Sequence, residues 1–127
     1  MKVKILIIDD EPDITFVLEG MLSKEGYAVD TAGSVADAEE KMEKNNYDLI
    51  LADIVLGSET GVDILREVKT KNLNSIVIFM TGFPTFDTAA EAIRLGVFDY
   101  LPKPIEKGRL VNTVRKALQS KGLVGKT

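Results

Sequence analysis

The chain has 127 residues, 45% of them hydrophobic, and a formal net charge of −4, a size and composition typical of one globular domain. It contains no cysteine and no histidine, which excludes disulfides, thiolate zinc sites and Ser-His-Asp catalysis and leaves only oxygen ligands for a metal. The charge is uneven, because residues 1–63 carry a net charge of −10 and residues 64–127 a net charge of +6.

The chain has no long apolar run and no long block of like charges, which disfavours a membrane and nucleic acid as partners. The longest apolar run, Ile5 to Ile8, is far too short to span a membrane, so we expect no membrane association. No block of five or six like charges occurs, so we expect no direct binding of nucleic acid by this domain. The absence of cysteine fits a reducing compartment, and we expect a cytoplasmic protein.

Five short segments are predicted as strands. In chain order they cover Val3–Ile8, Tyr27–Thr31, Leu49–Ala52, Ile76–Met80 and Val97–Leu101. The first, third and fourth are almost continuously apolar, which is typical of strands buried on both faces of a parallel sheet. The second and fifth mix apolar and polar residues, as edge strands do.

Helical periodicity follows each predicted strand. The apolar stripes are, in chain order, Ile14, Val17, Leu18, Met21 and Leu22; Val35, Ala38 and Met42; Ile64, Leu65 and Val68; Ala89, Ala90 and Ile93; and Leu110, Val111, Val114, Ala117 and Leu118. The fourth stripe is the smallest and least apolar. Pro12 suits the first turn of the first helix, and Ser34 with Asp37 resembles a capping box that opens the second.

Strict alternation of strands and helices predicts an α/β fold, a doubly wound five-stranded parallel sheet with helices on both faces. No linker divides the chain, so we expect one domain over residues 1–121, followed by a flexible tail or the start of a linker over residues 122–127. In open sheets of this kind, ligands bind beyond the carboxyl ends of the strands, so the residues at those ends are the candidate site.

Polar residues follow four of the five predicted strands: Asp9, Asp10 and Glu11 after the first, Asp53 after the third, Thr81 after the fourth and Lys103 after the fifth. Each alone can be explained as a helix cap, a turn residue or a loop charge, but their meeting at one sheet edge suggests a site. Two like charges 4 Å apart repel by about 4 kcal/mol at an effective dielectric constant of 20, so clustered carboxylates need a cation. Oxygen ligands suit Mg²⁺, and a cation beside an ammonium group favours phosphoryl chemistry.

Four segments resemble the receiver domain of two-component response regulators: Ile7–Glu11, Ile50–Ile54, Met80–Gly82 and Phe98–Pro104. The resemblance covers residues 1 to about 120 and is greatest to receivers of enhancer-binding transcriptional activators. It implies a flavodoxin-like (βα)5 fold with strand order 2-1-3-4-5.

The resemblance also implies roles for single residues. Asp53 resembles the phosphoacceptor, and Asp9, Asp10, Asp53 and the carbonyl of Val55 resemble the Mg²⁺ ligands. Thr81 and Lys103 resemble the groups that bind phosphoryl oxygens, and Tyr100 resembles the switch aromatic that turns inward with Thr81. The Lys103–Pro104 bond is implied to be cis.

The implied partners are a histidine kinase, which supplies the phosphoryl group, and a downstream output domain or effector protein. A phosphorylation-dependent homodimer is also compatible with the family. The resemblance implies no enzyme beyond a domain that catalyses its own phosphorylation and dephosphorylation. One departure concerns the loop after Leu56, where the family often has Pro-Gly and this chain has Gly57–Gly61, so we expect a looser loop beside Asp53.

Two alternatives remain open. A phosphohydrolase that uses an aspartyl phosphate needs Asp-x-Asp after the first strand, whereas Glu11 occupies the third position here. A binding module that acts without phosphorylation is the other alternative. The presence of Asp9, Asp10, Asp53, Thr81 and Lys103 together disfavours it.

Overall fold

The computed structural model describes residues 2–56, 59–71 and 74–124. Its main sheet has five strands, β1 (Lys4–Ile8), β2 (Ala28–Ala32), β3 (Leu49–Asp53), β6 (Ile76–Thr81) and β7 (Asp99–Pro102). They lie in the order β2-β1-β3-β6-β7, and every neighbouring pair is parallel. Since β6 and β7 are the fourth and fifth strands of this sheet in chain order, the predicted order 2-1-3-4-5 is confirmed.

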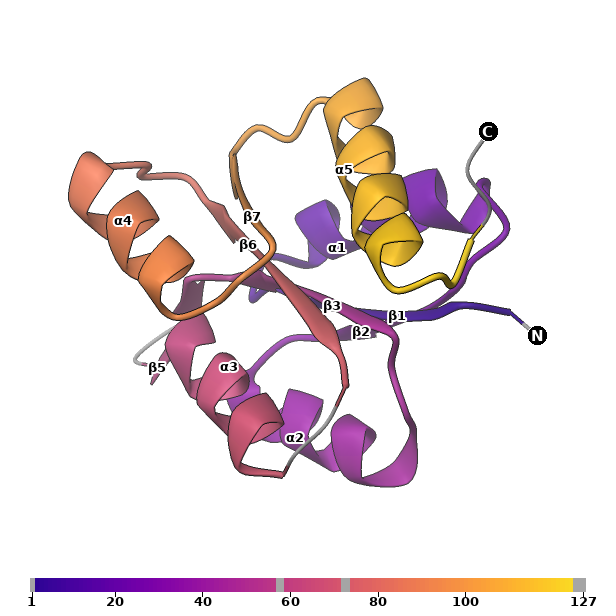
Figure 1. The fold of residues 1–127 in the computed structure, drawn as a ribbon, viewed down its shortest axis with the longest axis horizontal. Helices are drawn as coiled ribbons and strands as arrows, with labels where there is room; N and C mark the ends of the chain where they lie inside the picture. Colours follow the sequence, from indigo (N-terminus) through magenta and orange to yellow (C-terminus); the bar gives the residue numbers. More distant parts are fainter. Residues whose placement is uncertain (1, 57–58, 72–73, 125–127) are drawn as a thin grey trace.

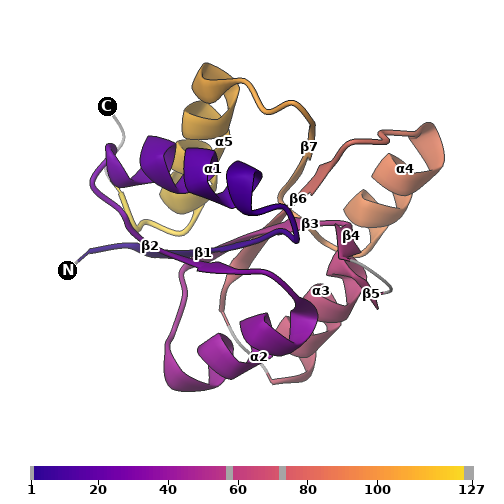
Figure 2. The ribbon, with the colours of Figure 1, turned by 180° about the vertical axis from the view of Figure 1, so that it is seen from behind.

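Five helices cover the sheet: α1 (Pro12–Ser23), α2 (Val35–Lys44), α3 (Gly61–Thr70), α4 (Phe86–Arg94) and α5 (Lys107–Ser120). Helices α1 and α5 lie on one face and α2 and α3 on the other, as Figures 1 and 2 show from opposite sides. Helix α4 belongs to the second face and stands beside β6 and β7. Among the described residues, no helix is both long enough and apolar enough to cross a membrane.

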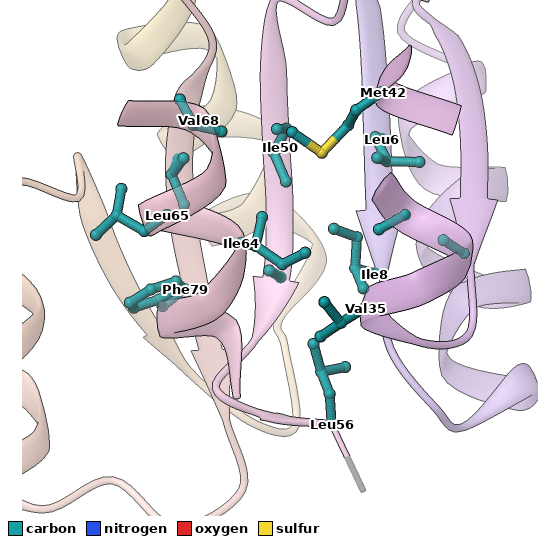
Figure 3. Packing of buried hydrophobic residues seen from close by; sticks show 14 of the residues in the cluster. Leu6, Ile8, Val35, Met42, Ile50, Leu56, Ile64, Leu65, Val68 and Phe79 are labelled. Atoms are coloured by element: carbon teal, nitrogen blue, oxygen red, sulfur yellow. The ribbon is translucent and has the colours of Figure 1, made fainter. Parts of the chain in front are cut away.

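The core is divided by the sheet into two clusters, because successive residues of a strand point to opposite faces. Leu6 and Ile50 pack toward α2 and α3, whereas Ile7 packs toward α1 and α5. Figure 3 shows Met42 of α2 reaching Ile50 of β3, with Ile64 of α3 packed further along the same strand. Both faces of β1 and β3 are therefore covered, which accounts for their apolar runs and fixes the strand ends that lead into the candidate site.

The predicted start of α2 is half correct. The Ser34 hydroxyl oxygen accepts a hydrogen bond from the Asp37 backbone N–H at 3.1 Å, as a capping box requires. The reciprocal bond is different, because the Asp37 carboxylate accepts from the N–H of Gly33 at 3.2 Å rather than from that of Ser34. The prediction for Pro12 is confirmed, since it is the first residue of α1.

Two of the predicted apolar stripes are partly wrong. Val17 of α1 is 53% exposed, and Ile93 of α4 is 70% exposed. In α4, Ala90 is exposed as well, and the buried residue is Ala92. In each case the apolar face of the helix is wider than the surface its neighbours cover, so residues at the edge of the stripe remain in solvent.

A short antiparallel pair, β4 (Val55–Leu56) and β5 (Glu59–Thr60), follows β3 and was not predicted. The pair ends at Gly61, whose N–H donates to the Ile54 carbonyl at 2.8 Å. A Cβ on Gly61 would lie 2.7 Å from the Asp53 carbonyl oxygen and 3.1 Å from the Phe79 ring, so only glycine fits. Gly57 and Ser58, on which the expected looseness of this loop depends, lie outside the described residues.

Two glycine substitutions should therefore act in opposite directions. Gly61→Ala forces the new methyl group against the backbone of Asp53, and we expect it to lower the free energy of unfolding by about 1–3 kcal/mol. Gly20→Ala, inside α1 where a Cβ meets no atom within 4 Å, should raise it by about 0.5–1 kcal/mol. Urea denaturation of both variants tests this, and an unchanged midpoint for Gly61→Ala would contradict the close approach.

Candidate functional site

The carboxyl ends of four strands bring the predicted residues together. Asp9 follows β1, Asp53 is the last residue of β3, Thr81 is the last residue of β6, and Lys103 follows β7. Asp9, Asp53 and Thr81 are buried, with exposed fractions of 1%, 6% and 3%. Asp10 is exposed at the rim. The sequence-based expectation that these side chains share one edge of the sheet is confirmed.

Lys103 is the centre of the cluster. Its Nζ lies 2.6 Å from Asp53 Oδ2, 2.6 Å from Asp9 Oδ2 and 3.4 Å from Glu11 Oε1. Its backbone N–H donates to the Thr81 carbonyl at 2.7 Å, which ties the loop after β7 to the end of β6. The Lys103–Pro104 peptide bond is cis, as the resemblance implied.

Each buried aspartate is oriented by the backbone that follows it. Asp9 Oδ1 accepts from the N–H of Glu11 at 3.0 Å, and Asp53 Oδ1 accepts from the N–H of Val55 at 2.9 Å. The same two-residue step therefore fixes one oxygen of both carboxylates. The other oxygen, Oδ2 in each case, is directed at the Lys103 ammonium.

Burial and charge act in opposite senses on these groups. Burial opposes the charge of Lys103, but the adjacent carboxylates of Asp53 and Asp9 outweigh it and raise the pKa of the ammonium above its ordinary value. Burial also raises the pKa of the Asp9 carboxyl, while Lys103 and the N–H of Glu11 partly offset this effect. The site thus holds its lysine charged, while a negative charge on the buried Asp9 carboxylate remains costly even beside this ammonium.

The acidic residues fit a hard divalent cation. Asp9, Asp10, Glu11 and Asp53 each offer one oxygen, and these oxygens lie within 4.8 Å of one another. Asp9 Oδ2 is buried and has no hydrogen-bond partner of suitable geometry among the described residues, only the charge contact with Lys103. Four carboxylates beside one ammonium leave an excess of negative charge, and an oxygen-only donor set is the kind that Mg²⁺ prefers. The predicted ligand role of the Val55 carbonyl stays a prediction.

Glu11 was expected at this edge of the sheet together with Asp9 and Asp10, but no role in the site was assigned to it. Its carboxylate lies 3.4 Å from Lys103 Nζ, on the solvent side. Its place as the third acidic residue after β1 indicates the shared edge, whereas its contact with Lys103, which lies 92 residues away in the chain, has no local signal in the sequence.

A cavity of about 140 Å³ opens beside these side chains, lined by Asp10, Glu11, Asp53, Val55, Thr81, Gly82, Phe83 and Lys103. One water occupies ~30 Å³ of the liquid, so the space suits a group of phosphoryl size with a few waters. The Thr81 hydroxyl oxygen accepts from the Phe83 N–H at 3.1 Å, which leaves its own proton to donate into the cavity. An anion here would meet the Lys103 ammonium and the Thr81 hydroxyl.

Tyr100 lies outside this cavity. It is half-buried on β7, and its hydroxyl is 2.7 Å from the hydroxyl of Thr88 in the first turns of α4. Thr88 is also part of the capping box of α4, in which its N–H donates to Oγ1 of the N-cap residue Thr85 at 3.1 Å and its hydroxyl oxygen accepts from the Thr85 N–H at 3.2 Å. Tyr100 therefore links β7 to α4, an arrangement that the sequence did not indicate.

Comparison with known proteins agrees with this geometry. The chain is 37% identical over 117 residues to the transcriptional regulatory protein ZraR of Klebsiella oxytoca, an alignment that covers 92% of this chain and 26% of the relative. The chain thus spans about a quarter of the length of the curated relatives it matches.

Solved structures give the same result. The beryllofluoride-activated NtrC4 receiver domain dimer superposes with a TM-score of 0.86 at 33% identity, covering 92% of this chain and 97% of that one. The response regulator TrrA of Thermotoga maritima, solved in complex with Mg²⁺ and BeF, gives a TM-score of 0.81 at 30% identity, covering 93% and 100%.

The family model of the response regulator receiver domain matches residues 5–115, which include Asp9, Asp53, Thr81 and Lys103. The chain therefore belongs to the receiver domains of response regulators, the phosphoryl-accepting switches of two-component signalling.

Proposed function

We propose that Asp53 accepts a phosphoryl group, in a Mg²⁺-dependent reaction, from a phosphohistidine on a partner histidine kinase. The observation that carries this proposal is the position of the Asp53 carboxylate. It is buried, its Oδ2 lies 2.6 Å from the Lys103 ammonium, and it lines a cavity of about 140 Å³ rimmed by further carboxylates. A nucleophile beside a fixed cation and an acidic cluster suits phosphoryl transfer, in which catalysis is mainly positioning and charge neutralisation.

In the proposed step, an Asp53 carboxylate oxygen attacks the phosphorus atom of the phosphohistidine. A P–O bond forms, the P–N bond breaks, and the leaving imidazole keeps the electron pair and takes up a proton. The N–H of Val55, 2.9 Å from Asp53 Oδ1, keeps the carboxylate aimed during the attack. When bound by Asp9, Asp10 and Asp53, Mg²⁺ supplies positive charge that offsets the carboxylates and the incoming phosphoryl oxygens.

After transfer, the Lys103 ammonium pairs with one phosphoryl oxygen and the Thr81 hydroxyl donates to another. The phosphoryl group adds about −1.5 to −2 units of charge and new acceptor oxygens at the end of β3. The segment after Thr81 leads directly into α4, so we propose that the response appears on the face of α4, β7 and α5, with Tyr100 as the switch aromatic. The domain also catalyses hydrolysis of its own acyl phosphate.

The names of the relatives support a proposal for the output. ZraR is named as a transcriptional regulatory protein, and the chain matches about a quarter of it. We propose that the phosphorylated face controls an output domain or effector protein in the cytoplasm. Because the NtrC4 receiver was solved as an activated dimer, phosphorylation-dependent pairing of two copies is part of the proposal.

Phosphorylation itself can be tested by intact mass after incubation with a small acyl-phosphate donor. With Mg²⁺ present, the wild-type chain should gain one phosphoryl group, and Asp53→Asn should gain none because it lacks the carboxylate nucleophile. Asp13→Asn removes an aspartate from the first turn of α1 and serves as the matched control, which should gain mass as the wild type does. An equal gain in Asp53→Asn, or none in the wild type, would overturn the proposal.

Mg²⁺ binding can be tested by thermal unfolding without any phosphodonor. At a Mg²⁺ concentration 100 times its Kd, a ligand that binds only the folded state stabilises it by about 2.7 kcal/mol, which raises Tm by several degrees. Asp10→Asn should abolish most of this shift, whereas Asp13→Asn should keep it. A shift of the same size in both variants would place the ion elsewhere.

Replacing the central lysine separates its two effects. Lys103→Met leaves Asp9 and Asp53 buried without a cation, so in the presence of a chelator we expect a loss of about 3 kcal/mol in the free energy of unfolding. The Mg²⁺-induced stabilisation should exceed that of the wild type, because no ammonium competes for the carboxylates. Lys116→Met, on the exposed side of α5, should change neither quantity in denaturation experiments with and without Mg²⁺.

A further inference from the structure

We infer that a cavity between α3 and α4, separate from the phosphorylation site, binds a small organic ammonium ion that carries an apolar ring. The cavity has a volume of about 220 Å³. Its apolar lining consists of Ile54, Val62, Phe79, Ala92 and Leu95. It shares no lining residue with the cavity beside Asp53. Its occupant would therefore be chosen by chemistry different from that of a phosphoryl donor.

The size of the cavity selects a ring-sized group. An apolar cavity of about 150 Å³ in another protein stays dry and takes up benzene, so 220 Å³ has room for a ring with one or two further atoms. The base of the cavity includes the Phe79 ring, which is fully buried in β6. Ile54, Val62 and Leu95 cover this ring and are themselves only partly buried, so their side chains offer the apolar surface that a ring in the cavity would contact.

The charge at the rim selects a cation. Asp87 and Glu91 lie one turn apart on α4, and both line the opening. Arg94 pairs with Glu91 at 3.1 Å, so these three side chains together leave one negative charge at the mouth. An ammonium group on a short arm would meet these carboxylates while its ring fills the apolar base, whereas a carboxylate on the same ring would be repelled.

The packing of α4 explains why an occupant would be accommodated. Among the described residues of this helix, only Ala92 is buried, and its side chain fills little space. A ring in the cavity would contact Ile54 after β3, Val62 of α3 and Leu95 at the end of α4, and so add apolar contacts that the helix lacks. Thr88 is also part of the wall, and its hydroxyl meets that of Tyr100. A consequence for signalling rests on the proposed function, but binding itself does not.

The test is an NMR titration of the unphosphorylated wild-type chain with benzylammonium, benzyl alcohol and phenylacetate, each at up to 20 mM as an order-of-magnitude range for such weak, small ligands. We expect saturable methyl shifts at Val62, Ala92 and Leu95, and at least threefold tighter binding of benzylammonium than of benzyl alcohol. Absence of saturable shifts, or equal binding of phenylacetate, would overturn the inference. No phosphodonor is present, so the result is independent of whether Asp53 is phosphorylated.

Two sets of variants localise the effect. Ala92→Leu fills the cavity and should weaken benzylammonium binding at least fivefold, whereas Ala90→Leu adds the same atoms on the exposed side of the helix and should leave it unchanged. Asp87→Asn combined with Glu91→Gln keeps the apolar lining and should remove the preference for the cation over the alcohol. If Ala92→Leu does not fold, the variant with Asp87→Asn and Glu91→Gln remains as the test. If that variant still binds benzylammonium more tightly than benzyl alcohol, the proposed role of the two carboxylates is wrong.

Discussion

The contact of one ammonium group with two buried carboxylates is the interaction on which the site depends. It requires three strand ends to coincide in space, and the register of the sheet provides this. Ile8 of β1 is paired with Ala52 of β3, so the next residues of the two strands, Asp9 and Asp53, emerge side by side. On the other flank Thr81 is paired with Pro102, which delivers Lys103 to the same point. A one-residue slip in either pair would turn these side chains to the opposite face.

The acidic excess costs free energy, and the complete burial of the central strands offsets this cost. Like charges held close together destabilise the folded chain unless a cation compensates them, and one lysine cannot balance four carboxylates. Apolar burial on both faces of β1 and β3 supplies the stabilising free energy that offsets this repulsion. The residues from Ile5 to Ile8 and from Leu49 to Ala52 are fully inaccessible to solvent. Stability and site therefore reside in the same strands, with the apolar segment holding the charged end in place.

Strands and site could be predicted from the sequence because their signals are local. A continuous apolar run marks a strand with two covered faces, and the polar residue that ends it marks the edge where ligands bind. The features that the sequence did not predict depend on tertiary contacts or on segments too short to show a pattern. Periodicity identifies the apolar side of a helix but not how much of that side its neighbours cover, so Val17 and Ile93 were expected in the core. The contact between Thr88 and Tyr100 joins two surface positions that have no pattern in common. The pairing of β4 with β5 involves only two residues on each strand, too few for alternation to be visible.

The position of α4 connects the cavity beside Asp53 with the molecular surface. Only the short segment from Gly82 to Thr85 separates Thr81, which lines the site cavity, from the first residue of this helix. A hydrogen bond of ordinary strength contributes about 0.5–1.5 kcal/mol, and Ala92 adds little apolar area, so the attachment of α4 to the domain is weak. Driving a two-state equilibrium from 1:99 to 99:1 takes about 5.5 kcal/mol of differential stabilisation. Under the proposed function, new charge-assisted contacts of a phosphoryl group with Lys103 and Thr81 are of the right order to supply much of this. A shift at Thr81 would then act first on the helix that the fold holds least firmly, while the strands that hold the carboxylates stay fixed.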